Sequence, residues 1–149
     1  MKNTIICAAF CGTGKSFLCN QKNINAIEIE YWKYKDEGLQ KKYIKDIKKQ
    51  IGKVDYIFIS TDPDGLKILQ KQNIDIILVY PENKLRNEYL DRFIDRDSPH
   101  DFIGAFMKYW DIWLNELKEQ NYCSQIQLKS GEYLQDKLDE IEDITLKTI

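Results

Sequence analysis

The chain has 149 residues, of which 43% are hydrophobic, 12% aromatic and 31% charged, and its formal net charge at pH 7 is −2. This length suits one domain with a proper core, and the composition excludes a disordered chain. The net charge argues against nucleic acid as a partner, and no apolar segment of the sequence is long enough to span a bilayer.

The compartment that we expect is the cytoplasm. The N-terminus lacks the layout of a signal peptide, because Lys15 interrupts its apolar stretch. His100 is the single histidine, which excludes a metal site built from several histidines. The cysteines form no C-x-x-C pair and are interpreted as reduced thiols that pack as small hydrophobes. They are Cys7, Cys11, Cys19 and Cys123.

Hydrophobic patterns predict strands that alternate with helices along the whole chain. Strands are expected at residues 4–7, 26–32, 54–60, 75–80 and 124–128. Helices are expected at residues 15–22, 36–50, from 63 onward, 82–95 and 101–120, with a tail after Gly131 that begins as a helix and then frays. This alternation predicts a single α/β domain with a five-stranded parallel sheet, which binds ligands beyond the carboxyl ends of its strands.

The most informative stretch runs from Ala9 to Ser16 and reads A-F-C-G-T-G-K-S. It lies between a predicted strand and a predicted helix and fits the P-loop pattern G-x-x-x-x-G-K-[ST], except that alanine replaces the first glycine. Gly12 and Gly14 allow successive N–H groups to turn inward around phosphate oxygens. Lys15 would reach the β- and γ-phosphates, and the Ser16 hydroxyl would ligate Mg²⁺. The alternative is an ordinary strand-to-helix turn.

Two glutamates, Glu28 and Glu30, stand near the end of the second predicted strand. Strand alternation places both carboxylates on one face, close to the predicted phosphate loop. One of them, which we take to be Glu28, would hold Mg²⁺ through water, while the other would position the phosphoryl acceptor. The alternative is a pair of solvent-facing charges on an edge strand.

Arginines follow the fourth predicted strand at Arg86, Arg92 and Arg96. The last two are four residues apart and can share a helical face. On a mobile helical hairpin, Arg92 and Arg96 would close over the transferring phosphoryl group. The alternative is a set of surface arginines in ion pairs with neighbouring carboxylates.

Two further patterns have simpler interpretations. The aromatic stripe from Phe102 to Leu117, which includes Trp110 and Trp113, is typical of a core or an interface, and it offers a surface for a homodimer. The lysine run from Lys41 to Lys53 is interpreted as a solvated helix face, with an anion or nucleic-acid surface as the alternative.

Together these segments, from residue 3 to about residue 134, resemble the small P-loop kinases of the nucleoside monophosphate kinase and shikimate or gluconate kinase group. Residues 79–92 are also similar to kinase-like proteins of bacteriophages. The resemblance implies a three-layer P-loop NTPase fold with a helical lid at about residues 82–104. It further implies that the loop following the last strand, residues 129–132, packs on adenine.

The resemblance also implies a set of site residues. Those expected to bind the ATP cofactor are Cys11, Gly12, Thr13, Gly14, Lys15, Ser16, Phe17 and Lys129. Those expected in catalysis are Lys15, Glu28, Glu30, Arg92 and Arg96, with Ser16 and Glu28 on the metal. Glutamates stand where such kinases usually carry aspartates, which moves the charge by about one methylene.

The sequence therefore predicts an ATP- and Mg²⁺-dependent phosphotransferase whose acceptor is a small molecule, namely a nucleotide or deoxynucleotide monophosphate. Two alternatives stay open. The first is a kinase for a non-nucleotide hydroxyl or a nucleic-acid 5′-hydroxyl. The second is a nucleotide-binding module without turnover, favoured because no buried strand ends directly in an aspartate: Asp62 stands two residues beyond Ser60.

Overall fold

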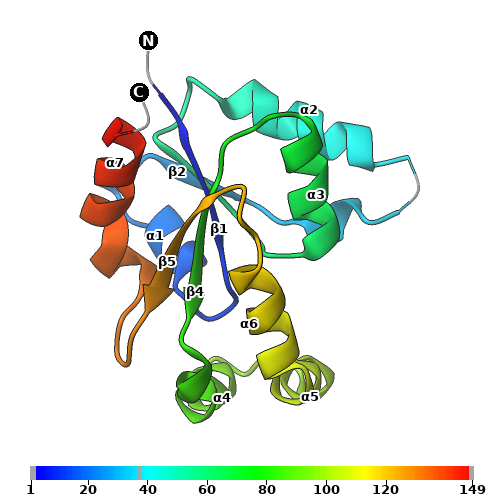
Figure 1. Cartoon of the computed structure of the whole chain (residues 1–149), viewed down its shortest axis with the longest axis vertical. Helices are drawn as coiled ribbons and strands as arrows, with labels where there is room; N and C mark the ends of the chain where they lie inside the picture. The colour runs from blue at the N-terminus through cyan, green and yellow to red at the C-terminus, as the bar shows by residue number, and fades with distance from the viewer. Residues whose placement is uncertain (1–2, 37, 148–149) are drawn as a thin grey trace.

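The computed structural model describes residues 3–36 and 38–147. Within them, five parallel strands form one sheet in the order β2-β3-β1-β4-β5 (Figure 1). The strands are β1 (Ile5–Ala9), β2 (Ala26–Ile29), β3 (Tyr56–Ile59), β4 (Ile77–Pro81) and β5 (Ser124–Leu128). The predicted α/β class and five-stranded parallel sheet are confirmed.

Helices flank the sheet on both faces (Figure 1). Those that pack on one face are α2 (Gln40–Gln50), α3 (Pro63–Lys71), α4 (Arg86–Asp95), α5 (His100–Lys108) and α6 (Trp110–Lys118). Those on the other face are α1 (Lys15–Cys19) and α7 (Leu138–Lys147). Helices α4 and α5 lie at the end of the sheet toward which the strands run (Figure 1).

The central strands are buried on both sides, which explains their nearly continuous apolar sequences. Ala8 and Ile57 point into the hydrophobic cluster under α2, α3, α4 and α6, whereas Cys7 and Phe58 point into the cluster under α1 and α7. All four cysteines are free thiols, as expected, and burial raises the pKa of Cys7 to about 12. The alternation along each strand therefore divides the core into two layers.

Several predicted ends are wrong. The first strand continues to Ala9 because its last residues pair with Leu78 and Val79 of β4. The second strand stops at Ile29 and is followed by a short 3₁₀ helix, Tyr31–Tyr34, because Tyr31 turns into the core and is only 2% exposed. Helix α2 begins at Gln40 rather than at residue 36, after Gly38 takes a left-handed φ of 93°; Glu37 lies outside the described residues.

Other helices also differ from their predicted lengths. Helix α1 ends at Cys19 rather than at residue 22, where Asn20 donates its N–H back to Phe17. A second 3₁₀ helix, Asn83–Leu85, precedes α4. The predicted fraying of the tail is wrong, because a third 3₁₀ helix, Leu134–Lys137, leads into α7, which buries Ile141 fully and continues to Lys147.

The helix predicted over residues 101–120 is two helices, α5 and α6, separated at Tyr109. Tyr109 has φ −103° and ψ 12°, which lie outside the helical range. The break lets Trp110 enter the core, where it is 1% exposed and its indole nitrogen donates to the Asn83 carbonyl at 2.7 Å. Phe106 and Trp113, on either side of the break, stay half-buried.

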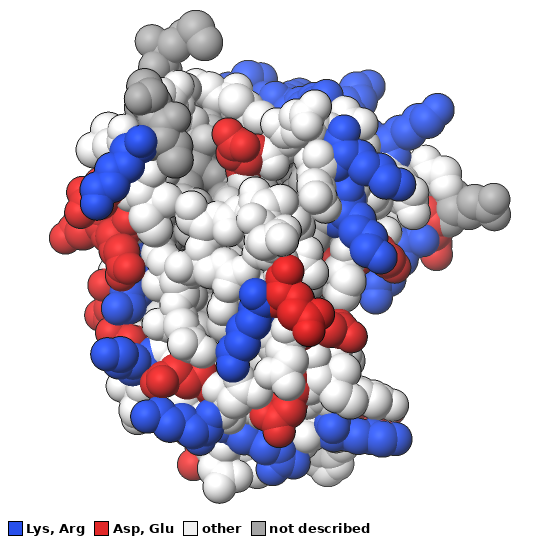
Figure 2. Space-filling model, viewed as in Figure 1, with Lys and Arg blue, Asp and Glu red and all other residues white. Residues whose placement is uncertain are grey.

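The surface charges are unevenly distributed (Figure 2). Lysines gather over α2, where Lys41, Lys45 and Lys49 are exposed, as the interpretation of a solvated helix face expected. Acidic side chains gather over α7 on the opposite side of the molecule (Figure 2). In the described part of the chain, no helix is long and apolar enough to cross a membrane.

Candidate functional site

A glycine-rich loop, residues 10–14, connects β1 to α1. Gly12 and Gly14 have φ values of 84° and 96°, which residues with a Cβ rarely adopt. A Cβ on Gly12 would also come within 3.0 Å of Phe93 and 3.1 Å of Tyr89, both buried in the core. Thr13 is fully buried and donates its hydroxyl to the Phe10 carbonyl at 2.7 Å. The loop is thus compact and requires its glycines.

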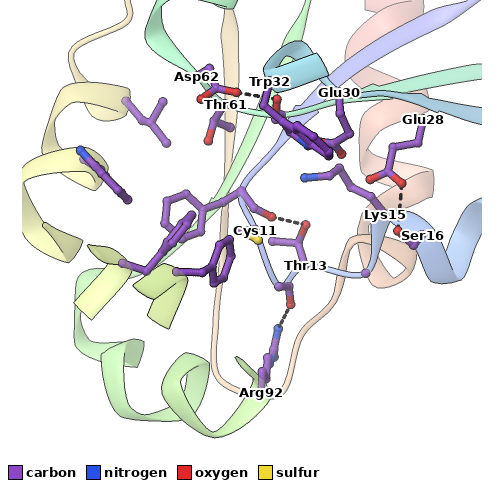
Figure 3. Close-up of a pocket in the computed structure, with 18 of the residues that line it drawn as sticks. Cys11, Thr13, Lys15, Ser16, Glu28, Glu30, Trp32, Thr61, Asp62 and Arg92 are labelled. Carbon is purple, nitrogen blue, oxygen red and sulfur yellow. Dashed lines mark hydrogen bonds between the residues drawn. The ribbon is translucent and has the colours of Figure 1, made fainter. Parts of the chain in front are cut away.

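The two residues after the loop turn their side chains toward the end of β1 and toward β2. Lys15 is 8% exposed, and its Nζ donates to the Ala9 carbonyl at 2.7 Å. The Ser16 hydroxyl donates to Oε1 of Glu28 at 2.9 Å. Lys15, Ser16 and Glu28 therefore meet at one place (Figure 3), as the sequence predicted for three of its site residues.

Glu28 lies in β2 and Glu30 directly follows it, and their side chains share a hydrogen bond, so the two carboxylates lie together. Burial raises the pKa of Glu30 to about 7, with further increases from its hydrogen bond to Glu28 and from the charge of Asp62. Burial also acts to raise the pKa of Glu28, but hydrogen bonds from Glu30 and Ser16 and the charge of Lys15 outweigh it and hold that pKa below its usual value. The pair thus holds one proton, mostly on Glu30, below about pH 7 and releases it above that pH.

Arg92 is bound tightly between the glycine-rich loop and the segment after β5. Its guanidinium donates to the Gly12 carbonyl at 2.9 Å and to the Glu132 carbonyl at 3.1 Å, and it pairs with Glu88 at 3.1 Å. The same group lies 4.3 Å from the ring centre of Tyr89 and 3.9 Å from that of Tyr133, and its side chain is only 10% exposed.

The other two arginines lie in different surroundings. Arg96 donates to the Cys11 sulfur and to the Ser98 hydroxyl, both at 2.9 Å, so it reaches the same loop at the end of α4. Arg86 is exposed and donates to the Met107 carbonyl at 3.0 Å, which joins α4 to α5. Arg86 therefore binds the neighbouring helix, whereas Arg92 and Arg96 both contact the loop.

The predicted adenine loop, residues 129–132, is tied to α4 and lies beside the glycine-rich loop. The Ser130 hydroxyl and the Gly131 N–H donate to Glu88 at 2.5 and 3.1 Å. Leu134, just beyond, donates its N–H to the Thr13 carbonyl at 2.8 Å. These bonds hold the segment after β5 against the glycine-rich loop.

A cleft of about 1170 Å³ opens beyond the carboxyl ends of the strands. It brings together every loop residue expected to bind a cofactor, from Cys11 to Phe17, with both glutamates and with Arg92 and Arg96. Lys129 is not among the described residues that line it, whereas Tyr133 is. Sequence reasoning missed several of its other residues, namely Trp32, Lys33, Lys35, Asp62, Phe106 and Trp113. Figure 3 shows Trp32 beside Glu30 and Asp62 beside Thr61.

Asp62 is the missed residue with the clearest sequence signal. It precedes α3 and accepts a hydrogen bond from Ser60 at 2.9 Å, and it lies 3.9 Å from Lys35. Because β3 is hydrogen-bonded to both β1 and β2, a carboxylate just beyond β3 lies next to the loop and next to Glu30. Among the described residues, no cluster of three or more His, Cys, Asp or Glu side chains is arranged to hold a metal.

Comparisons with known proteins support the fold of the chain. No protein-family model matches the sequence, and no curated protein matches it. A solved structure described as "Crystal structure of uncharacterized protein from Eubacterium ventriosum ATCC 27560" is similar, with a TM-score of 0.51 at 16% identity. The similarity covers 99% of this chain and 98% of that one, so it concerns the whole fold.

Proposed function

We propose that this protein is an ATP- and Mg²⁺-dependent phosphotransferase of the P-loop kinase class. The observation that carries the proposal is the convergence of Lys15, Ser16 and Glu28 at a compact glycine-rich loop that lines a large cleft. The sequence favours a nucleotide or deoxynucleotide monophosphate as the acceptor.

The surroundings of Lys15 favour an anion as the ligand of the loop. Its hydrogen bond goes to a neutral carbonyl, so this contact does not compensate a positive charge that is 8% exposed. A buried ammonium group is costly unless an anion completes its surroundings. Phosphate oxygens placed at the loop would supply that charge and also accept hydrogen bonds from the loop amides.

The residues around Ser16 fit a magnesium ion. Mg²⁺ is usually held by one or two side-chain oxygens together with phosphates and waters, rather than by a cage of protein ligands. The Ser16 hydroxyl and the Glu28 carboxylate, 2.9 Å apart, offer such a pair of oxygens. The ion would neutralise charge on the phosphates to which it is bound.

The remaining residues position the reactants. Lys15 and the loop amides hold the phosphates of the donor, and the Glu28–Glu30 pair faces the acceptor. Arg96, at the mouth of the loop beside Cys11, stabilises charge on the group in transfer. Helices α4 and α5 form the helical lid over this end of the sheet.

A second candidate is a nucleotide-binding module without turnover. One observation favours it: Arg92 is already engaged with two backbone carbonyls and Glu88. An arginine held in this way supports the loop instead of closing over a substrate.

The test is calorimetric titration with ATP in the presence of Mg²⁺, followed by measurements of ATP consumption with candidate acceptors. Removing a buried charge from a charge pair costs about 2–5 kcal/mol, so Lys15→Ala should weaken ATP binding about 30-fold or more. Lys45→Ala, at an exposed position on α2, is the matched control and should bind ATP as the wild type does. An unchanged affinity in Lys15→Ala would refute the loop as the phosphate site. Tight ATP binding without acceptor-dependent turnover would favour the second candidate.

A further inference from the structure

The cleft has room for a second ligand beside the donor. Its volume, about 1170 Å³, exceeds the range of about 300–1000 Å³ typical for a site that holds one small molecule. The glycine-rich loop lines only a part of it. Another part is lined by α5, α6 and the residues that follow β2 and β3, and the proposed function assigns no ligand to its α5 and α6 side.

One wall of that region is aromatic. Phe102, Phe106 and Trp113 are half-buried and line the cleft. The Phe102 and Phe106 ring centres are 4.5 Å apart, and Phe106 meets Trp113 edge to face at 4.9 Å. Phe10, which is buried, packs behind Phe106 at 5.4 Å. A rigid wall of this kind binds a flat ring by stacking and by burial of apolar area.

Another part of the lining carries carboxylates. Glu30 and Asp62 stand beyond the ends of β2 and β3, and the charges of Asp62, Glu28 and Lys15 all act on Glu30. The lysines that line this part of the cleft are Lys35, which lies 3.9 Å from Asp62, and Lys33, whose ammonium group lies 5.5 Å from the centre of the Trp32 ring. Carboxylates repel a phosphate dianion placed beside them, so the Glu30 and Asp62 side of the region disfavours a second phosphate. A hydroxyl group instead donates a hydrogen bond to a carboxylate, and it needs a base to accept its proton.

We propose that this region is the acceptor subsite and that it takes a nucleoside, with its base against Phe106 and Trp113 and its sugar hydroxyl directed to the Glu28–Glu30 pair. This inference rests on the proposed function and changes the acceptor favoured by the sequence from a monophosphate to a hydroxyl. In the reaction, the hydroxyl oxygen forms a bond to the γ-phosphorus of ATP. The bond from that phosphorus to the β–γ bridging oxygen breaks, ADP leaves, and the hydroxyl proton passes to the carboxylate pair.

The experiment measures initial rates with ATP and Mg²⁺ for four kinds of acceptor: nucleosides, nucleoside monophosphates, hydroxy acids without an aromatic ring, and an oligonucleotide with a free 5′-hydroxyl. Phosphorus NMR identifies the product. We expect nucleosides to be the best acceptors and to yield nucleoside monophosphates. A higher kcat/KM for any of the other three kinds would overturn the assignment.

Variants of the aromatic wall separate the subsite from the fold. Phe106→Leu and Trp113→Leu keep apolar bulk but remove the stacking surface, and we expect the nucleoside KM to rise about 5- to 100-fold. The affinity for ATP should stay within about twofold of the wild type. Ile112→Leu, at an exposed position on α6 that does not line the cleft, is the control and should leave both constants unchanged. A nucleoside KM that is unchanged in both wall variants contradicts the proposed subsite.

Calorimetric titration with a nucleoside alone distinguishes this inference from the proposed function. If ATP fails to bind but a nucleoside binds and is weakened by Trp113→Leu, the subsite stands and the phosphotransferase proposal fails. If ATP binds and no nucleoside binds or reacts, the subsite is refuted while the loop remains a nucleotide site.

Discussion

Replacing Arg92 tests whether this arginine supports the fold or acts on a substrate. The sequence predicts a mobile lid arginine, whereas the structure shows a side chain 10% exposed that bridges the glycine-rich loop, α4 and the segment after β5. Arg92→Ala would remove two hydrogen bonds to backbone carbonyls and the pair with Glu88. It would also leave Tyr133 without the cation that stacks on its ring.

The expected loss of stability follows from these contacts. A hydrogen bond from a charged donor contributes about 1.5–3 kcal/mol, and breaking a buried ion pair costs about 3–5 kcal/mol. Because these contributions overlap, we expect Arg92→Ala to lower the free energy of unfolding by about 3–5 kcal/mol, which for a domain of this size lowers the melting temperature by about 6–20 °C. Urea denaturation followed by circular dichroism measures the first quantity, and calorimetry the second.

Two further variants sharpen the test. Arg92→Lys keeps the charge but not the planar fork, so it should still cost about 1.5 kcal/mol or more. Arg86→Ala removes an exposed arginine that donates to the Met107 carbonyl, and it should cost about 1 kcal/mol or less. A stable Arg92→Ala protein that binds ATP normally and has lost only turnover would refute the structural role and restore the sequence prediction.

Two other measurements probe the site and the core. Burial raises the pKa of Glu30 from 4.5 to about 7, so the folded state keeps a proton there that the unfolded state releases at lower pH. The free energy of unfolding contributed by this group therefore falls as pH rises from 4.5 to about 7. The glutamine in Glu30→Gln does not titrate, so the free energy of unfolding of this variant, measured with urea, should rise relative to that of the wild type as pH increases from about 5 to about 8. A difference between the two proteins that does not change with pH would contradict the raised pKa. A Cβ at Gly65 would lie 2.9 Å from the Tyr31 ring, so Gly65→Ala should lower the free energy of unfolding by about 1–3 kcal/mol. A Cβ at Gly104 in α5 would meet open space, so Gly104→Ala should raise the free energy of unfolding by about 0.5–1 kcal/mol. Equal urea midpoints for the Gly65→Ala and Gly104→Ala variants would show that the space around these glycines does not determine stability.

The sheet could be predicted because its signals are local. Strands β3 and β4 are apolar runs between polar turns. The spacing of the glycines after β1 indicates where the strand ends and helix α1 begins. The loop residues and the Glu28–Glu30 pair could be predicted for the same reason, since alternation and motif spacing act within a few residues.

The helix boundaries that failed depend on distant partners. Tyr31 leaves the expected strand because a glycine at position 65 of α3 makes room for its ring. Tyr109 interrupts the expected helix because Trp110 finds the Asn83 carbonyl, 27 residues away in the chain. Neither partner lies within the window over which helical or strand periodicity is measured, so tertiary packing overrides the local pattern.

The cleft shows the same limit for function. Phe106 and Trp113 fit the spacing of a core stripe, and two neighbours in that stripe, Trp110 and Leu117, do have 1% and 4% exposure. The break at Tyr109 divides this one pattern, so that Trp110 enters the core while Phe106 and Trp113 line the cleft. The carboxylates that follow β2 and β3, Glu30 and Asp62, line the same cleft. The acceptor subsite that we propose thus combines two segments that each fit ordinary structure when taken alone, and its chemistry depends on their being brought into one cleft.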